Sequence, residues 1–347
     1  MLLHAAALAA LLLHSYVPAV AARQTQGVPA SRVAQVLERA RNSAALDDAA
    51  YNESLSVGYA LIGETRYAEA ASIFDALVQR RPRDFAALYG GALATFNAGR
   101  AAEAQPLAGR AVDAALEGLV RTREANARAS DAFVLLAVVE AVRGDNVSAL
   151  RDVRRAVELA PENFDAQLAL GRALYGAGND AEAVRAFRAA VALKPSDARA
   201  LFFLATALER AGDTEGALAA YRQLALKQPR AHEGHLGLGV MLTKRGGAEA
   251  DEGVRELALA LEIDPNLYEA RVTLGRALLS EGRAQEAVEH LRRAAELAPG
   301  NPEPHYQLSL AYRRLGRRRE AAAESAIVER IHESRRKTGA TNSPPEK

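Results

Sequence analysis

The sequence has 347 residues, and its composition excludes several classes of protein. A formal net charge of +1 provides no long-range attraction to nucleic acid or to an anionic membrane, so we expect no nucleic-acid partner. Cysteine is absent, which excludes disulfides and a thiol nucleophile. Hydrophobic residues make up 49% but aromatic residues only 5%. An apolar content supplied mainly by alanine and leucine is typical of closely packed helices.

Residues 1–22 have the pattern of an export signal. An apolar run from Ala5 to Leu13 is followed by Pro18 and then by the small residues up to Ala22. The run is shorter than the roughly 20 apolar residues of a membrane-spanning helix. An apolar segment that ends in small residues predicts cleavage after Ala21 or Ala22 and a periplasmic or secreted protein with no transmembrane helix after cleavage. Because no lysine or arginine precedes the apolar run, a retained anchor and a mis-assigned start stay open.

Residues 23–50 precede the regular part of the chain. We expect a linker and then a helix over 31–46, because the terminal unit of a stacked array needs a cap.

Five prolines mark an internal repeat along the rest of the chain. Pro161, Pro195, Pro229, Pro265 and Pro299 are 34, 34, 36 and 34 residues apart. A period of this length indicates a solenoid of stacked helical units rather than one globular core. Alignment on the prolines divides the chain into eight units over 51–335: 51–84, 85–118, 130–163, 164–197, 198–231, 232–267, 268–301 and 302–335.

Each unit has a small residue at two equivalent positions. One is the eighth residue of the unit, as in Gly58 and Gly171, and the other opens the second apolar stretch, as in Ala70 and Ala183. Small side chains at these positions let two helices approach closely, and a bulky one would separate them. Each unit is therefore expected to be a helical hairpin, which we describe as an A helix followed by a B helix.

This pattern resembles the tetratricopeptide repeat family across about 285 residues. The resemblance implies an all-α, right-handed superhelical solenoid of about eight helical hairpins, with a concave groove lined by the A helices. Three departures from the family pattern stand out. The aromatic residue at the fourth position is replaced in five units, the second unit lacks its proline, and Glu140 takes an apolar inward position. The replacements are Ser54, Gln167, His235, Arg271 and His305.

Glu140 and the insertion before it each allow two interpretations. Arg143 lies three residues further along the same helix, so we expect an ion pair with Glu140 or a local register shift rather than catalysis. The insertion spans 119–129 and has no glycine or proline. Its length is about three helical turns, which favours a B helix that continues to about Ala127, with Ser130 as the N-cap of the next helix. The alternative is a loop.

The resemblance implies that groove residues lie at fixed positions of each A helix. The first three units then provide an apolar zone and the remaining units a zone of mixed charge. The apolar zone suits an amphipathic helix or a hydrophobic peptide, and the polar zone an extended segment. The chain's own helix at 31–46 is an alternative occupant of the apolar zone. The expected partner-binding residues are Tyr59, Tyr89, Leu93, Phe96, Asn97, Val134, Val138, Arg172, Tyr175, Arg199, Phe202, Arg210, Lys244, Arg276, Tyr306 and Arg313.

The sequence shows no catalytic, cofactor-binding or metal-binding motif. His232 and His235 are three residues apart, whereas a zinc-protease helix places its two histidines four apart. His235 also occupies the aromatic packing position of its unit, which favours a structural role. The last unit is rich in arginine and continues to Arg336 and Lys337. This run is either a solvated outer face or a weak contact with an anionic surface. Residues 336–347 are expected to be a disordered tail.

These observations predict an exported, non-enzymatic scaffold that binds a peptide, a helix or a partner protein in its concave groove, within a cell-envelope assembly. The alternative is an accessory subunit of an enzyme or of a polysaccharide-handling complex, which would have the same sequence features.

Overall fold

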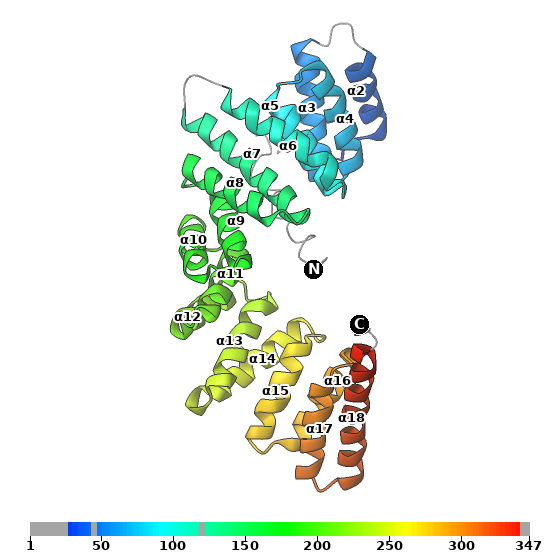
Figure 1. Cartoon of the computed structure of the whole chain (residues 1–347), viewed down its shortest axis with the longest axis vertical. Helices are drawn as coiled ribbons and strands as arrows, with labels where there is room; N and C mark the ends of the chain where they lie inside the picture. Colours follow the sequence, from blue (N-terminus) through cyan, green and yellow to red (C-terminus); the bar gives the residue numbers. More distant parts are fainter. Residues whose placement is uncertain (1–26, 43–46, 118–121, 341–347) are drawn as a thin grey trace, which may run out of the picture. The chain divides into compact units, whose positions relative to one another are not determined.

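The computed structural model describes residues 27–42, 47–117 and 122–340. The expected export signal lies outside these residues. Within them, every regular element is helical, with seventeen α-helices and one short 3₁₀-helix (Figure 1). The predicted all-α helical repeat solenoid is confirmed. The helices fall into two compact units: unit 1 ends at Pro195, and unit 2 begins at Ser196.

Unit 1 consists of one single helix and four consecutive hairpins in the described residues. The single helix is α2 (Ala30–Asn42). The hairpins are α3 (Asp48–Gly63) with α4 (Tyr67–Arg80), α5 (Phe85–Asn97) with α6 (Ala101–Leu116), α7 (Arg123–Val142) with α8 (Asn146–Leu159), and α9 (Phe164–Gly176) with α10 (Asp180–Leu193).

Unit 2 continues the same arrangement with four more hairpins. These are α11 (Ala198–Arg210) with α12 (Thr214–Lys227), α13 (His232–Arg245) with α14 (Ala250–Ile263), α15 (Tyr268–Ser280) with α16 (Ala284–Leu297), and α17 (Pro302–Arg314) with α18 (Arg318–Ala340). The 3₁₀-helix η3 (Gly247–Glu249) lies in the connection between α13 and α14.

Local sequence signals start and end these helices. Asn163 caps α9 by accepting hydrogen bonds from the backbone N–H groups of Asp165 and Ala166, which satisfies donors that a helix start leaves free. Gly178 ends the turn between α9 and α10 at φ +78°, a left-handed conformation that glycine adopts without steric cost. The first hairpin places Thr65 in the equivalent turn at φ 59°.

Close approach of paired helices explains the small residues of the repeat. A Cβ atom on Gly171 would lie 2.5 Å from the ring of Phe187, and one on Gly58 would lie 2.7 Å from the ring of Phe74. Both phenylalanine rings are fully buried. The missing side chains therefore create the space that the aromatic rings of the B helices fill.

Helix α2 packs on the first hairpin, against α3 and α4. Its apolar face buries Val33, Val36 and Ala40, and Arg80 of α4 donates from Nε to the Ala40 carbonyl at 3.3 Å. Just before the helix, the Val28 amide donates to Oε1 of Glu64 at 2.7 Å. The chain before the first hairpin thus covers apolar surface that a terminal unit would otherwise expose.

The insertion at 119–129 lengthens a different helix from the one that its length favours. Helix α6 ends at Leu116, so a B helix that continues to about Ala127 is wrong. Residues 123–129 instead extend the next A helix at its start, and the cap is Thr122, whose Oγ1 accepts from the Ala125 amide at 3.1 Å. Ser130 is not a cap. It is buried within α7 and donates to the Ala156 carbonyl at 2.9 Å.

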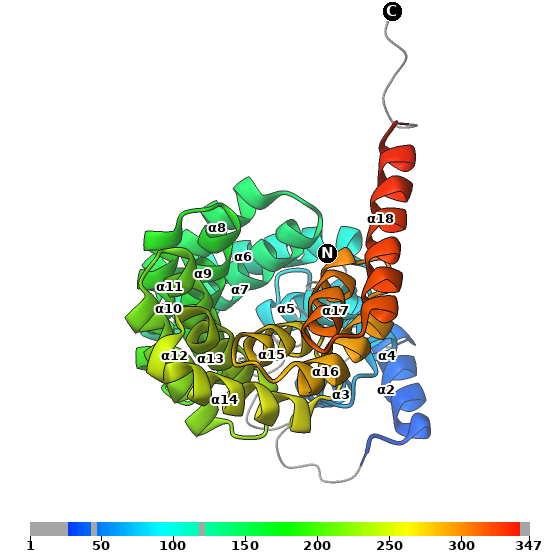
Figure 2. The ribbon, with the colours of Figure 1, turned by 90° about the horizontal axis from the view of Figure 1, so that it is seen from below.

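The last helix is also longer than expected. Helix α18 has 23 residues, whereas its partner α17 has 13, and its end continues past the rest of the hairpin (Figure 2). The expected disordered tail is therefore wrong for residues 336–340, which are helical. Residues 341–347 lie outside the described part of the chain.

Substitution of Gly171 tests the close approach. We expect Gly171→Leu to destabilise unit 1 by about 1–3 kcal/mol, because the new side chain overlaps the ring of Phe187 and overpacks the helix pair. Urea denaturation followed by circular dichroism measures this as a lower midpoint. Gly176→Ala on the same helix is the control, since nothing lies within 4 Å of its added Cβ. Equal midpoints for Gly171→Leu and the wild type would contradict the packing account.

Candidate partner-binding surface

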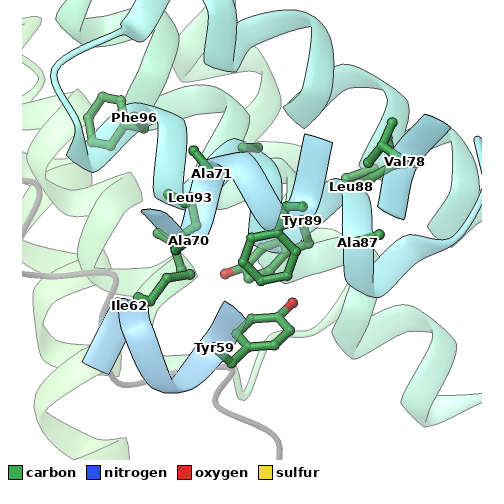
Figure 3. Packing of buried hydrophobic residues seen from close by; sticks show 14 of the residues in the cluster. Tyr59, Ile62, Ala70, Ala71, Val78, Ala87, Leu88, Tyr89, Leu93 and Phe96 are labelled. Carbon is green, nitrogen blue, oxygen red and sulfur yellow. The ribbon is translucent and has the colours of Figure 1, made fainter. Parts of the chain in front are cut away.

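The apolar half of the expected groove is buried. Six of its residues belong to the hydrophobic core cluster of unit 1, and several are seen packed together in Figure 3. All six side chains are 6% exposed or less: Tyr59, Tyr89, Leu93, Phe96, Val134 and Val138.

Aromatic packing accounts for part of this burial. The ring of Tyr59 lies edge-on to Phe74 with centroids 5.1 Å apart, and its hydroxyl donates to the Ala86 carbonyl at 2.8 Å. Tyr89 stacks on Phe85 at 5.6 Å. These side chains serve as core in the described structure, so the expectation that they form an exposed apolar binding zone is not met.

The other expected residues of unit 1 are partly accessible. Asn97 is half-buried and donates from Nδ2 to the Leu93 carbonyl of its own helix at 2.8 Å. Arg172 and Tyr175 are half-buried on α9. Unit 1 therefore offers few fully exposed side chains among the residues expected to contact a partner.

Unit 2 presents most of its expected residues to solvent. Lys244, Arg276 and Arg313 are exposed, as is Arg210, and Tyr306 is 50% exposed. Phe202 is half-buried. Arg199 is engaged locally, since its Nη2 donates to Oδ2 of Asp197 at 2.9 Å, and Asp197 in turn caps α11. Arg199 therefore has a structural partner at the helix start.

The last three A helices of unit 2 repeat one surface pattern. On α15, Glu269, Val272 and Arg276 follow the i, i+3, i+7 spacing of a single helical face. On α17, the same face carries Glu303, Tyr306, Leu310 and Arg313, and on α13 it carries Glu233, Leu236, Val240 and Lys244. Each helix thus has an acidic residue near its start and a basic residue further along, which lies in the last turn of α13 and α17 but not of α15. Of the apolar residues between them, Tyr306 is exposed, Val272 is buried and the others are half-buried. We call this set of residues the unit 2 stripe.

The charges of the stripe suit the helices that carry them. A carboxylate near a helix start and a cation near its end both complement the helix dipole. The side chains of Lys244, Arg276 and Glu269 make no hydrogen bond or ion pair with any residue in the described part of the chain. Arg313 has a weak contact, from Nη2 to Ser325 Oγ at 3.4 Å. Most of this charge is therefore available to an external partner.

Part of the arginine-rich last hairpin is used internally. Arg314 donates to the Leu279 carbonyl, Arg317 to Gln285 Oε1 at 3.2 Å, and Arg335 to the Gly300 carbonyl at 2.8 Å. These bonds tie α17 and α18 to the preceding hairpin and its turn. They favour the structural interpretation for these three residues over contact with an anionic surface.

The structure agrees with the expected structural role of His235 but not with the expected ion pair of Glu140. His235 is 9% exposed, which agrees with the structural role that its repeat position indicates. Within the described ranges, no group of three His, Asp or Glu side chains is placed to hold a metal ion. The expected pair between Glu140 and Arg143 is wrong, because Arg143 is exposed and forms no ion pair within the described residues.

Glu140 instead lies against a second carboxylate in the α7–α8 hairpin. It is 5% exposed, and its Oε2 has no hydrogen-bond partner among the described residues. Asp152 of α8 accepts from Arg151 Nε at 2.7 Å. Burial, and then the charge of Asp152, raise the pKa of Glu140 to about 7. Sequence reasoning missed this pair because the partner lies on the other helix of the hairpin.

Comparisons with known proteins agree with the repeat pattern. A family model described as tetratricopeptide repeat matches residues 143–198, 168–225 and 204–267. A second model, described as TPR repeat, matches residues 275–316. No curated protein matches the sequence at a significant level. Within the described residues, no helix has the length and apolar character needed to cross a membrane.

Solved structures resemble the fold at low sequence identity. The C-terminal part of a TPR repeat-containing protein from Cytophaga hutchinsonii has 14% identity and a TM-score of 0.55, with 73% of this chain and 99% of that one covered. A tetratricopeptide repeat protein from Parabacteroides merdae has 15% identity, a TM-score of 0.50, and coverage of 75% and 98%. The Pseudomonas aeruginosa protein pilF has 18% identity, a TM-score of 0.52, and coverage of 60% and 93%. At these identities the likeness concerns the fold alone.

The buried carboxyl of Glu140 predicts a pH-dependent stability. Because its folded pKa of about 7 lies above the ordinary value of 4.5, the stabilisation is complete below pH 4.5 and is lost as the pH rises through 7. We expect Glu140→Gln to reduce the fall in the urea midpoint of unit 1 between pH 5 and pH 8. The exposed Glu124 on the same helix provides the control, Glu124→Gln. A fall of the same size in Glu140→Gln and wild type would contradict this role.

Proposed function

The chain is a tetratricopeptide-repeat protein, and we propose that it works as an exported, non-enzymatic scaffold whose unit 2 stripe binds a partner protein. Tetratricopeptide-repeat proteins are scaffolds for protein–protein interaction, and stacked repeats provide extended surfaces for this purpose. The partner, the export and a place in a cell-envelope assembly are the parts of this proposal that go beyond the family.

The observation that carries the proposal is the repeated order of charge along α13, α15 and α17. Glu269 and Arg276 are about 10 Å apart along their helix, and Val272 between them is buried, so α15 presents its charges rather than an apolar contact. A partner segment with opposite charges at its two sides would complement these charges on three successive hairpins, and an apolar group on it would meet the exposed ring of Tyr306 on α17. Lys244 and Arg276 have exposed charges that are not used within the described structure, and such charges are suited to charge-assisted hydrogen bonds.

The proposed export depends on the first 22 residues. An apolar run followed by small residues, with the repeat array after it, is the order of a secreted protein with a cleaved signal. A scaffold delivered in this way would assemble its partners outside the cytoplasm. A cell-envelope assembly is the setting that we propose for it.

Photo-crosslinking from Tyr306 tests the proposed surface. We expect a photoreactive residue at position 306 to form a discrete adduct with one partner protein in envelope extracts, identified by mass spectrometry. The control site is Leu226, which is 77% exposed on α12 of the same unit. With the identified partner, Lys244→Glu combined with Arg276→Glu should weaken binding by at least about tenfold, because it places like charges in contact.

A charge-matched variant separates surface recognition from net charge. Arg230→Glu combined with Arg255→Glu makes the same change in net charge at exposed residues outside the stripe. This variant should bind within about twofold of the wild type. Equal weakening by both double variants, or equal crosslinking from positions 226 and 306, would show that the stripe is not the binding surface.

Determination of the mature N-terminus tests the proposed export. We expect intact-mass measurement of the protein from its native envelope fraction to give a chain that begins at Ala22 or Arg23, because small residues at −3 and −1 direct the cleavage. The control is a variant that combines Ala19→Arg with Val20→Arg, which removes the small residue at −3 of both cleavage sites and should keep the full N-terminus. A wild-type chain that retains residues 1–22 would contradict cleavage.

A further inference from the structure

Equivalent side-chain pairs join the two helices of three successive hairpins in unit 2. Each pair links the fourth residue of the A helix with the seventh residue of the B helix. In α13–α14 the pair is His235 and Glu256, and in α17–α18 it is His305 and Glu324. In the hairpin between them, α15–α16, the same positions hold Arg271 and His290.

The two outer pairs are short contacts between unlike groups. Nδ1 of each histidine lies 2.7 Å from a carboxylate oxygen, Oε2 of Glu256 in one hairpin and Oε2 of Glu324 in the other. His235 also has its Nε2 3.3 Å from the Pro229 carbonyl. Both of these partners are hydrogen-bond acceptors when Glu256 is ionised. The imidazole of His235 thus has a polar partner at each of its two ring nitrogens.

The middle hairpin has the opposite arrangement. Arg271 takes the equivalent bond to the chain before it, from Nε to the Pro265 carbonyl at 2.8 Å. Its charge acts on His290, which occupies the place where the neighbouring hairpins have glutamate. Nδ1 of His290 is buried without a hydrogen-bond partner among the described residues. A proton on His290 would therefore add a second positive charge to a half-buried contact, and that charge is costly there.

The other charges around His290 do not provide a close carboxylate partner. Glu286 and Glu289 act on it from its own helix, but Glu286 is bound by Arg283 at 2.7 Å. Arg293, also on α16, acts on Arg271 and adds further positive charge. Helix α17 packs on the other side of α16, and no described residue of it forms a hydrogen bond or ion pair with His290. Burial, followed by the charge of Arg271, lowers the pKa of His290 below 6.5.

We propose that α15–α16 is an acid-sensitive hairpin set between two hairpins in which a histidine instead meets a carboxylate, so that unit 2 opens first at Arg271 and His290 when the pH falls. This inference goes beyond the proposed partner binding and does not depend on it. Because the folded form favours neutral His290, its contribution to stability is complete above pH 6.5 and is lost as the pH falls below that value.

Hydrogen exchange of the full chain at pH 7.5 and pH 5.5 tests the proposal. Rates are read by mass spectrometry and corrected for the pH dependence of intrinsic exchange. In the wild type we expect protection of α15 and α16 to fall at least about threefold at pH 5.5, relative to α13–α14 and α17–α18. His290→Gln cannot gain a proton, so this relative fall should disappear. His332→Gln, at an exposed histidine on α18, is the control and should keep it.

A double substitution at these two positions gives a second, independent variant. Arg271→His combined with His290→Glu rebuilds in the middle hairpin the pair that its neighbours have, and it should also remove the relative fall. Circular dichroism at pH 7.5 verifies that each variant is folded. If the double variant does not fold, the result for His290→Gln alone tests the proposal. A wild-type α15–α16 hairpin that keeps its protection at pH 5.5, or a relative fall that persists in His290→Gln, would overturn the proposal.

Discussion

The structure depends on how closely the two helices of each hairpin approach. The rings of Phe74 and Phe187 occupy space that side chains at Gly58 and Gly171 would fill. The same contact recurs in unit 2, where a Cβ on Gly275 would lie 2.5 Å from Leu291. Because interiors are close-packed, the spacing of one hairpin constrains its neighbours. The repeated sequence pattern therefore reflects the small side-chain volume that close helix packing requires.

This packing determines which side chains remain for other roles. The apolar residues of each hairpin are used for stacking, and in unit 1 even Tyr59 and Tyr89 are part of the core. What remains accessible in unit 2 is largely charged, with Glu269 and Arg276 at the two ends of one helical face. A surface of this kind favours specificity and orientation of a partner more than bulk apolar affinity.

Polar groups inside the hairpins have a separate consequence. Glu140 and His290 both lie at positions where the family pattern calls for close helix contact, and each has a buried atom without a hydrogen-bond partner among the described residues. Burial shifts their protonation in opposite directions, since it disfavours the charged form of each group. We therefore expect the α7–α8 hairpin to lose stability as the pH rises and the α15–α16 hairpin to lose it as the pH falls.

The sequence by itself determined that the chain forms a series of helical hairpins, because Pro161, Pro195 and the small residues at equivalent positions act through local backbone and volume constraints. It did not determine which neighbouring helix the insertion lengthens. In the structure α6 ends at Leu116, and Thr122 caps the lengthened α7. The tertiary structure alone decided that Tyr59 is buried and that His235 meets Glu256. Burial and pairing arise between helices, where residues more than twenty positions apart come into contact.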